Sequence, residues 1–178
     1  MTLTAASTLA DVLAAYPGAR RALFREYHLG GCSSCAFSPD ETLAALCARN
    51  GGLNPAEVLA HLSRSHEGDL TLLVEPHALA EELKSPAPPR LLDLRSREDW
   101  EAARVPGSEV FTQEHMQEIL GRWDRAQPFV LVDHAGREGL DAAAYFAGHG
   151  FTAVRALRGG VDAWSREVDP AVPRYRLE

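Results

Sequence analysis

Short apolar runs alternate with helical segments in the second half of the chain, and this alternation limits the fold more than any other feature. The clearest runs are LLDLR at residues 91–95 and FVLV at residues 129–132, and a shorter one follows at 152–155. Each is largely continuous in apolar residues, as expected of strands that are buried on both faces. We therefore predict an α/β fold in which a parallel sheet has helices on both faces.

The first part of the chain shows only helical patterns. The sequence SPDE at residues 38–41 predicts a helix start, with Ser38 as the N-cap and proline at the first helical position. The sequence NPAE at residues 54–57 repeats this capping pattern. The glycine pair at residues 30–31 is expected to end the helix that precedes it. We therefore predict a small all-helical domain over residues 1–66 and the α/β domain over residues 69–178.

Charge and hydropathy exclude several classes of function. The chain has 25 acidic and 18 basic residues and a formal net charge of −7. An acidic surface argues against nucleic-acid binding, which depends on neutralising phosphates. No apolar run approaches the length of a membrane span, and the N-terminus lacks a signal-peptide pattern. We expect a cytoplasmic protein with no membrane partner, in which three cysteines indicate thiol, metal or redox chemistry.

Three motifs in the second half occur in an order that is typical of one family. The first is LDLRSREDW at residues 92–100, followed by RVPGS at 104–108. The second is the strand VLV followed by DHAGRE at 133–138, and the third is LRGGVDAW at 157–164. Together they resemble the rhodanese-like domain, in which a strand is followed by an active-site loop of the pattern Cys-x-x-Gly-x-Arg. The resemblance implies a sulfurtransferase fold over about residues 69–175.

The active-site loop departs from that pattern at its chemical centre. The loop consists of Asp133, His134, Ala135, Gly136, Arg137 and Glu138. The resemblance places Asp133 where the family has its persulfide-forming cysteine and Glu138 where arginine is common. Sulfane sulfur transfer needs a polarisable thiolate, and no cysteine follows Cys47 in the chain. We therefore predict that this domain is not a sulfurtransferase, and we assign no catalytic residue to it.

The resemblance implies an anion-binding loop, because its backbone N–H groups point inward at the start of a helix. An aspartate there introduces a negative charge, and like charges a few Å apart repel by about 1–4 kcal/mol in wet surroundings. Three roles for Asp133 follow. Its carboxylate fills the loop as a built-in anion, the loop recognises a cation, amine or partner protein, or Asp133 acts with His134 in a hydrolytic reaction.

A pair of cysteines carries the chemistry of the first domain. The segment YHLGGCSSCAFSPDETL at residues 27–43 resembles the hybrid-cluster-protein-associated redox disulfide domain, whose pattern is G-C-x-x-C followed by E-T-L. Cys-x-x-Cys spacing lets a dithiol and a disulfide interconvert, which makes Cys32 and Cys35 candidate redox or sulfur-accepting thiols. Alternatively, they could bind a metal together with His28, with Cys47 or His61 as a fourth ligand. The remaining possibility is that Cys32 and Cys35 are two ordinary thiols in a turn.

Three functions remain compatible with these patterns. The first is a non-catalytic rhodanese-like module that is joined to a redox dithiol domain and acts in sulfur or thiol traffic by binding. The second is a sulfur carrier or thiol oxidoreductase that uses Cys32 or Cys35. The third is a metal-binding or iron–sulfur-related protein. We expect no cofactor, and we expect the partner to be a thiol- or sulfur-handling protein; the oligomeric state is left open.

Overall fold

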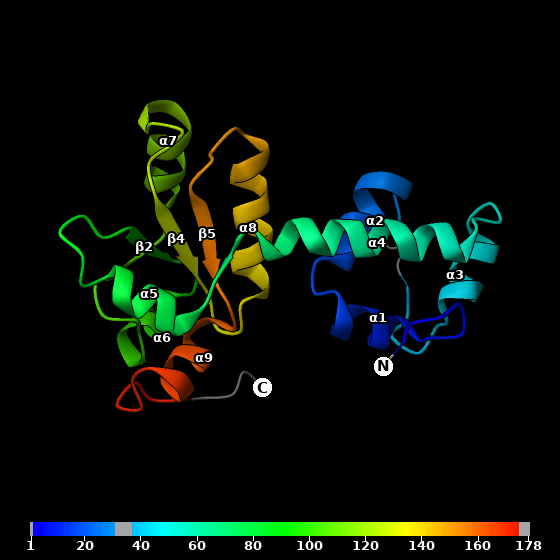
Figure 1. Ribbon diagram of the computed structural model, residues 1–178, viewed down its shortest axis with the longest axis horizontal. Helices are drawn as coiled ribbons and strands as arrows, with labels where there is room; N and C mark the ends of the chain where they lie inside the picture. Colours follow the sequence, from blue (N-terminus) through cyan, green and yellow to red (C-terminus); the bar gives the residue numbers. More distant parts are fainter. Residues whose placement is uncertain (1, 31–36, 175–178) are drawn as a thin grey trace. The chain divides into compact units, whose positions relative to one another are not determined.

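The computed structural model describes residues 2–30 and 37–174, and the chain divides into two compact units, residues 1–70 and 71–178. Each unit has its own buried core. The predicted combination of a helical part followed by an α/β part with a parallel sheet is confirmed (Figure 1). Within the described ranges, no helix has the length and hydropathy that crossing a membrane requires.

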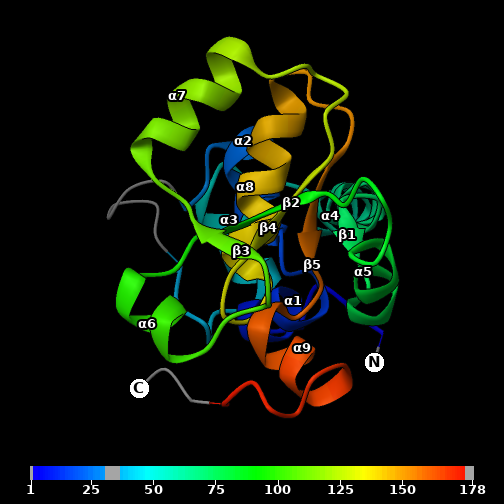
Figure 2. The same ribbon diagram turned by 90° about the vertical axis from the view of Figure 1, so that its left-hand side faces the viewer.

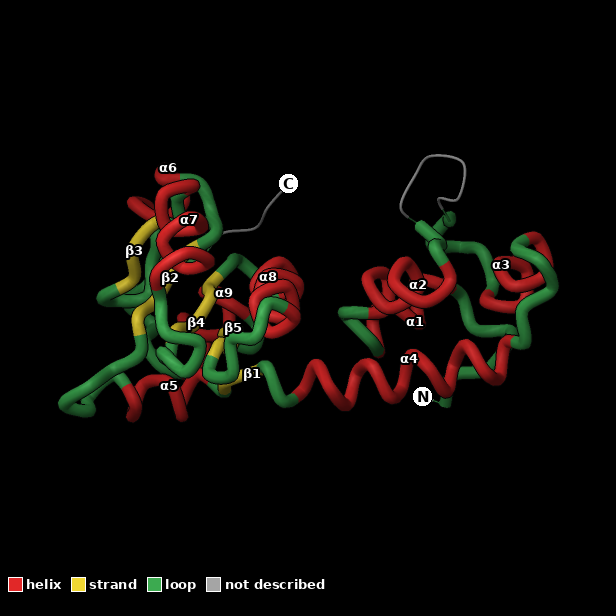
Figure 3. Tube along the Cα trace, turned by 90° about the horizontal axis from the view of Figure 1, so that it is seen from above, coloured by secondary structure: helices red, strands yellow, loops and turns green. Residues whose placement is uncertain are grey.

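The described residues of the first unit, 2–30 and 37–70, form four helices. They are α1 (Leu9–Ala15), α2 (Ala19–Tyr27), α3 (Leu43–Arg49) and α4 (Pro55–Leu70) (Figure 3). Their apolar faces meet in one cluster that includes Leu9, Leu23, Leu46 and Leu62. Asn54 begins α4 as predicted, because its side-chain oxygen accepts the Ala56 N–H at 3.0 Å. The helix continues to Leu70, so the predicted domain boundary falls within it.

The predicted helix start at Ser38 is wrong, because α3 begins at Leu43 with Thr42 as its N-cap. The segment before Thr42 makes other bonds. The N–H groups of Leu9 and Ala10 donate to the carbonyls of Glu41 and Pro39. In return, the first N–H groups of α3 donate to carbonyls of the segment before α1, and Thr8 and Thr42 form an isolated antiparallel bridge. Two helix starts thereby satisfy each other's unpaired donors.

The end of α2 also differs from the expectation. The helix stops at Tyr27, and His28 adopts the left-handed conformation with φ 56°. The glycines at 30–31 were expected to supply this stop. The left-handed conformation is sterically unfavourable for a histidine. The helix end is closed by hydrogen bonds, because the N–H groups of His28 and Leu29 donate to the carbonyls of Phe24 and Leu23.

The second unit is a five-stranded parallel sheet in the order β1-β5-β4-β2-β3. Helices α7 and α8 pack on one face, while α5 and α9 pack on the other (Figure 2). Neighbouring residues alternate between the two cores: Leu91 and Val130 belong to one, and Leu92 and Leu131 to the other. The strands are β1 (Leu73–Val74), β2 (Arg90–Asp93), β3 (Ser108–Val110), β4 (Phe129–Val132) and β5 (Val154–Leu157). The helices are α5 (Pro76–Glu82), α6 (Arg97–Ala102), α7 (Gln113–Arg122), α8 (Arg137–Gly148) and α9 (Gly160–Glu167).

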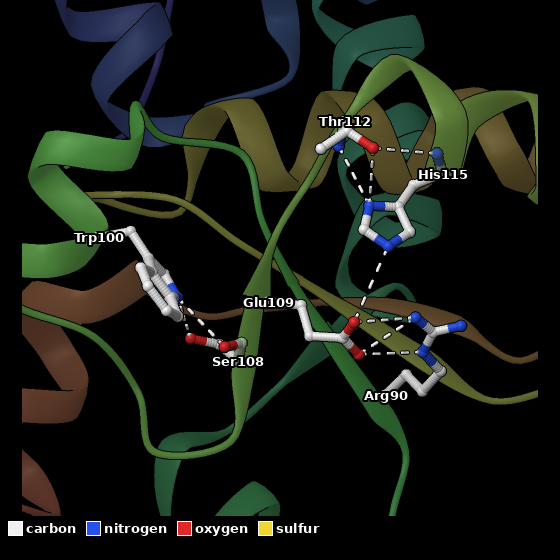
Figure 4. Close-up of polar contacts among 6 residues, drawn as sticks. All are labelled: Arg90, Trp100, Ser108, Glu109, Thr112 and His115. Carbon is white, nitrogen blue, oxygen red and sulfur yellow. Dashed lines mark hydrogen bonds and ion pairs between the residues drawn. The ribbon is translucent and has the colours of Figure 1, made fainter.

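Strand β3 and helix α7 were not predicted from the sequence. The edge strand has only three residues, and polar contacts hold it and the start of α7 (Figure 4). Glu109 accepts hydrogen bonds from Arg90 at 3.1 Å, and the Trp100 indole N–H donates to Ser108. Helix α7 begins with a capping box in which His115 occupies the position that is usually Glu or Gln. Its Nδ1 atom accepts a hydrogen bond from the Thr112 N–H. A search for the usual capping pattern therefore misses this helix.

The actual start of α3 leads to a stability prediction. Thr42→Ala removes the side-chain acceptor for the Ala45 N–H and should lower the free energy of unfolding by about 1 kcal/mol. Ser38→Ala is the matched control, and we expect it to change that free energy by less than about 0.5 kcal/mol. Urea unfolding followed by the helical circular dichroism signal measures both. A larger loss for Ser38→Ala than for Thr42→Ala would contradict the assignment.

Candidate functional site

The candidate site lies where β2 and β4 end. These are neighbouring parallel strands, and ligands of parallel sheets bind beyond the carboxyl ends of the strands. A cavity of about 580 Å³ opens there between the loop that follows β2 and the loop that follows β4. Its lining comprises Leu94, Arg95, Ser96, Asp99, Asp133, His134, Ala135, Arg137 and Glu138. The predicted loop residues therefore line this cavity, with the exception of Gly136, which is buried against Gly159.

Asp133 is the first residue after β4, and its carboxylate turns back into its own loop. One oxygen accepts the Gly136 N–H at 2.7 Å, and the other accepts the Glu138 N–H at 3.0 Å. The residue is only 4% exposed. Both carboxyl oxygens are therefore engaged by backbone donors of its own loop, an arrangement compatible with the reading of Asp133 as a group that fills the loop.

Two opposing effects act on the acidity of Asp133. Burial raises the pKa of this carboxyl above its ordinary value and is the larger effect, since removal from water disfavours the charged form. The backbone N–H groups of residues 136–139 act in the opposite direction. The main influences that favour the charged form of Asp133 are therefore backbone hydrogen bonds of its own loop and helix start.

Helix α9 holds the same loop from the other side. The N–H groups of Val161 and Asp162 donate to the carbonyls of Asp133 and His134, at 2.9 and 3.1 Å. These bonds turn the carbonyls of the loop away from the cavity. Gly160 fits tightly beneath the loop, since a Cβ atom there would lie 2.3 Å from the Asp133 carbonyl oxygen. The glycine pair of the third sequence motif is therefore a close-approach point for the loop backbone.

A buried ion pair forms the opposite wall. The Arg95 guanidinium donates to both carboxylate oxygens of Asp93, at 2.9 and 2.7 Å, and to the Ala103 carbonyl at 2.6 Å. The Asp93 side chain is fully buried. Bidentate pairing of this kind fixes the guanidinium plane. Sequence reasoning did not assign Arg95, Ser96 and Asp99 to the site, although the first motif contains them, because only the strand order shows that β2 and β4 are neighbours.

The candidate residues of the helical unit are only partly described. Cys32 and Cys35 lie outside the described residues. His28 is exposed, and its ring contacts Phe24 edge-on. Cys47 is 1% exposed and has a free thiol, and burial raises the pKa of that thiol. Among residues 2–30 and 37–174, no group of three or more His, Cys, Asp or Glu side chains is arranged to hold a metal ion.

A family model agrees with this architecture. The model of the rhodanese-like domain matches residues 75–167, which is more than half of the chain. The parallel sheet and the loop at the start of α8 place the second unit among α/β proteins, and the family match relates it to sulfurtransferases. The chain belongs to the rhodanese-like domain family.

Solved structures of several similar proteins are known. The human single-domain sulfurtransferase is 23% identical over 54% of this chain and 96% of that chain, with a TM-score of 0.48. A rhodanese-like domain protein from Staphylococcus aureus is 17% identical over 58% of this chain and 98% of its own, with a TM-score of 0.44. A rhodanese-related protein from Thermoplasma volcanium is 17% identical over 53% and 91%, with a TM-score of 0.45.

The close approach at Gly160 predicts a large effect of one methyl group. Gly160→Ala places a Cβ against the Asp133 and His134 backbone at a residue with φ 59°, so we expect a loss of about 2–4 kcal/mol of unfolding free energy. Gly148→Ala is the matched control, because nothing lies within 4 Å of its added Cβ, and we expect no loss. Thermal unfolding of both variants tests this. Equal stabilities would show that the loop does not rest on Gly160.

Burial of Asp133 predicts a pH dependence of stability. Because the folded-state pKa is raised, the folded protein binds this proton more tightly than the unfolded chain does. The resulting stability is fully present below the unfolded pKa, near 3.8, and is lost as the pH rises through the folded pKa. The difference in unfolding free energy between the wild type and Asp133→Asn, taken as wild type minus variant, should therefore fall as the pH rises from the unfolded pKa to above the folded pKa of Asp133. Urea unfolding at several pH values measures it, and a rising difference would contradict the direction.

Proposed function

We propose that this protein is a catalytically silent rhodanese-like module joined to a redox dithiol domain, and that it acts in sulfur or thiol traffic by binding. The observation that supports this proposal is the position of the Asp133 carboxylate. It fills the loop at the point where the family resemblance places the sulfur nucleophile, and it accepts the Gly136 and Glu138 N–H groups.

The chemistry of sulfur transfer explains why an aspartate in place of a cysteine matters. In sulfane sulfur transfer, a thiolate attacks the outer sulfur of a donor such as thiosulfate, sulfite leaves, and a persulfide remains on the enzyme. A carboxylate is a poor nucleophile toward sulfur and forms no comparable stable adduct. The sequence holds no cysteine after Cys47, so the rhodanese-like unit contains no substitute thiol of its own.

The helical unit would supply the thiol chemistry. Cys32 and Cys35 have the spacing of a dithiol that cycles with a disulfide. In the alternative of a thiol oxidoreductase, one thiolate would attack the disulfide of a partner and form a mixed disulfide. The second thiolate then resolves it, so that the pair loses two electrons and two protons while the partner's disulfide is reduced to two thiols. The partner proposed here is accordingly a thiol- or sulfur-handling protein.

A sulfurtransferase assay tests the silent loop. The wild-type protein should convert thiosulfate and cyanide to sulfite and thiocyanate no faster than a buffer blank, because the described residues that line the cavity include no cysteine. Asp133→Cys is the informative variant: incubation with thiosulfate should add the mass of one sulfur atom to the intact protein. Thiocyanate production by the wild type that disappears in Asp133→Asn would overturn the proposal.

Thiol titration tests the dithiol. Oxidation by a disulfide reagent and subsequent reduction should release two thiols from the wild type and from Cys47→Ala, the matched control. Cys32→Ser and Cys35→Ser should each lose this reversible pair. A zinc or iron content that falls in both serine variants would instead support the metal-binding alternative and contradict the redox role.

A further inference from the structure

The chain contains two asparagines, and both lie in the connection between α3 and α4 (Figure 3). Asn50 is followed by Gly51, whereas Asn54 is followed by Pro55. We propose that Asn50 is a site of spontaneous covalent modification, at which the side-chain amide is converted into a carboxylate, and that this conversion opens the end of α3. The inference concerns the helical unit and does not depend on the proposed function.

The reaction is an intramolecular substitution at the side-chain carbonyl carbon of asparagine, one of the thermolabile residues. The Gly51 nitrogen gives up its proton to water and forms a bond to the Asn50 Cγ atom. The C–N bond of the side-chain amide breaks, ammonia leaves, and a cyclic succinimide remains. Water then adds to either of its two carbonyl carbons and opens the ring, which yields aspartate or isoaspartate. Water is consumed and ammonia released, and no atom is oxidised or reduced.

The first support is the accessibility of the attacking nitrogen. Gly51 is exposed and has no Cβ atom to hinder the approach. Within residues 2–30 and 37–174, the Gly51 N–H makes no hydrogen bond, whereas the N–H groups of Asn50 and Leu53 both donate to the Cys47 carbonyl. The Gly51 nitrogen can therefore move toward the side chain without breaking a hydrogen bond of its own.

The second support is the freedom of the backbone that must rotate for the ring to close. Asn50 ends α3 with φ −113° and ψ 57°, outside the helical region. Gly51 and Gly52 follow it in the left-handed region, with φ 82° and 69°. Beyond the adjacent residues, no atom lies within 4 Å of the position that a Cβ would occupy on either glycine. The turn therefore has both the space and the conformational freedom that the cyclic intermediate needs.

The second asparagine lacks the means to react in this way. The nitrogen that follows Asn54 belongs to Pro55 and carries no proton, so it cannot form the succinimide. The Asn54 side-chain oxygen is also in use, because it accepts the Ala56 N–H at 3.0 Å. Both asparagines lie in the same connection, so their difference in reactivity isolates the effect of the residue that follows.

Conversion of Asn50 removes a hydrogen bond that closes α3. The Asn50 Nδ2 atom donates to the Leu46 carbonyl at 2.8 Å. A carboxylate has no proton to donate there, and it adds negative charge at a helix end whose unpaired carbonyls already carry partial negative charge. Isoaspartate also lengthens the backbone between Cys47 and Leu53, which are joined by a hydrogen bond of 3.1 Å. Modification is therefore expected to destabilise the helical unit.

Peptide mapping of the full-length protein tests the site. Trypsin releases residues 50–64 as one peptide, which carries both asparagines. After incubation of the folded protein in mildly alkaline buffer, this peptide should have lost the Asn50 amide while Asn54 remains intact. The variant Asn50→Gln is the matched control and should keep its amide, because its longer side chain would have to close a larger ring.

A synthetic peptide of residues 45–57, incubated in parallel, shows that the conditions allow the reaction. Conversion in this peptide without conversion in the folded protein would overturn the inference, since the Leu46 bond would then protect the side chain. Loss of the Asn54 amide at the same rate as the Asn50 amide would overturn it as well.

Two charge variants test the consequence for α3. Asn50→Asp and Asn54→Asp add the same charge at the end of α3 and at the start of α4. Asn50→Asp should lower the melting temperature, because the Leu46 carbonyl loses its donor. Asn54→Asp should lower it less, since its carboxylate still accepts the Ala56 N–H at a helix start, although the 3.4 Å contact of Nδ2 with Glu57 is lost. An equal or smaller effect of Asn50→Asp would contradict the assigned role of the amide.

Discussion

The bonds between the Asp133 carboxylate and its own loop are the interaction on which the site depends. A buried carboxylate is costly unless its oxygens are hydrogen-bonded, and here the backbone of the following helix start supplies the donors. Burial nevertheless remains the larger influence on its pKa, which is raised. The loop therefore holds a carboxyl group whose two oxygens are hydrogen-bonded to backbone N–H groups, while burial disfavours its charged form.

The sheet places that interaction in a specific environment. Strands β4 and β2 run side by side and end at the same edge, which brings the Asp133 loop opposite the buried Asp93–Arg95 pair. The pair orients Arg95 in the wall of the cavity, and its positive charge is balanced by Asp93. The Arg95 guanidinium in the wall opposite the loop is therefore already paired with a carboxylate. The remaining charged side chains of the cavity lining belong to the loop and to α6.

Much of the α/β architecture could be predicted because its signals are local. The run FVLV coincides with β4, and β2 and β5 lie within two residues of the predicted runs. Strand β3 escaped prediction because its edge position and three-residue length leave no apolar run. The start of α3 was misplaced because Ser38 has a good capping sequence, while the backbone carbonyls of the same segment serve α1 instead. Long-range pairing of this kind leaves no trace in local sequence patterns. The position of Asp133 in the loop after β4 was predicted, whereas the places of Arg95, Ser96 and Asp99 in the same cavity required the order of the strands.

The Gly159–Gly160 turn has a consequence for how such a protein changes over time. The backbone of this turn packs closely against the neighbouring loop, and N–H groups of α9 donate to the carbonyls of Asp133 and His134, so these contacts do not use the side chains at positions 134, 135, 137 and 138. Mutations at those positions can alter the chemistry of the cavity lining while the contacts between the loop backbone and α9 are kept. Side chains that face the cavity can therefore diverge between such proteins while the loop backbone keeps its contacts with α9.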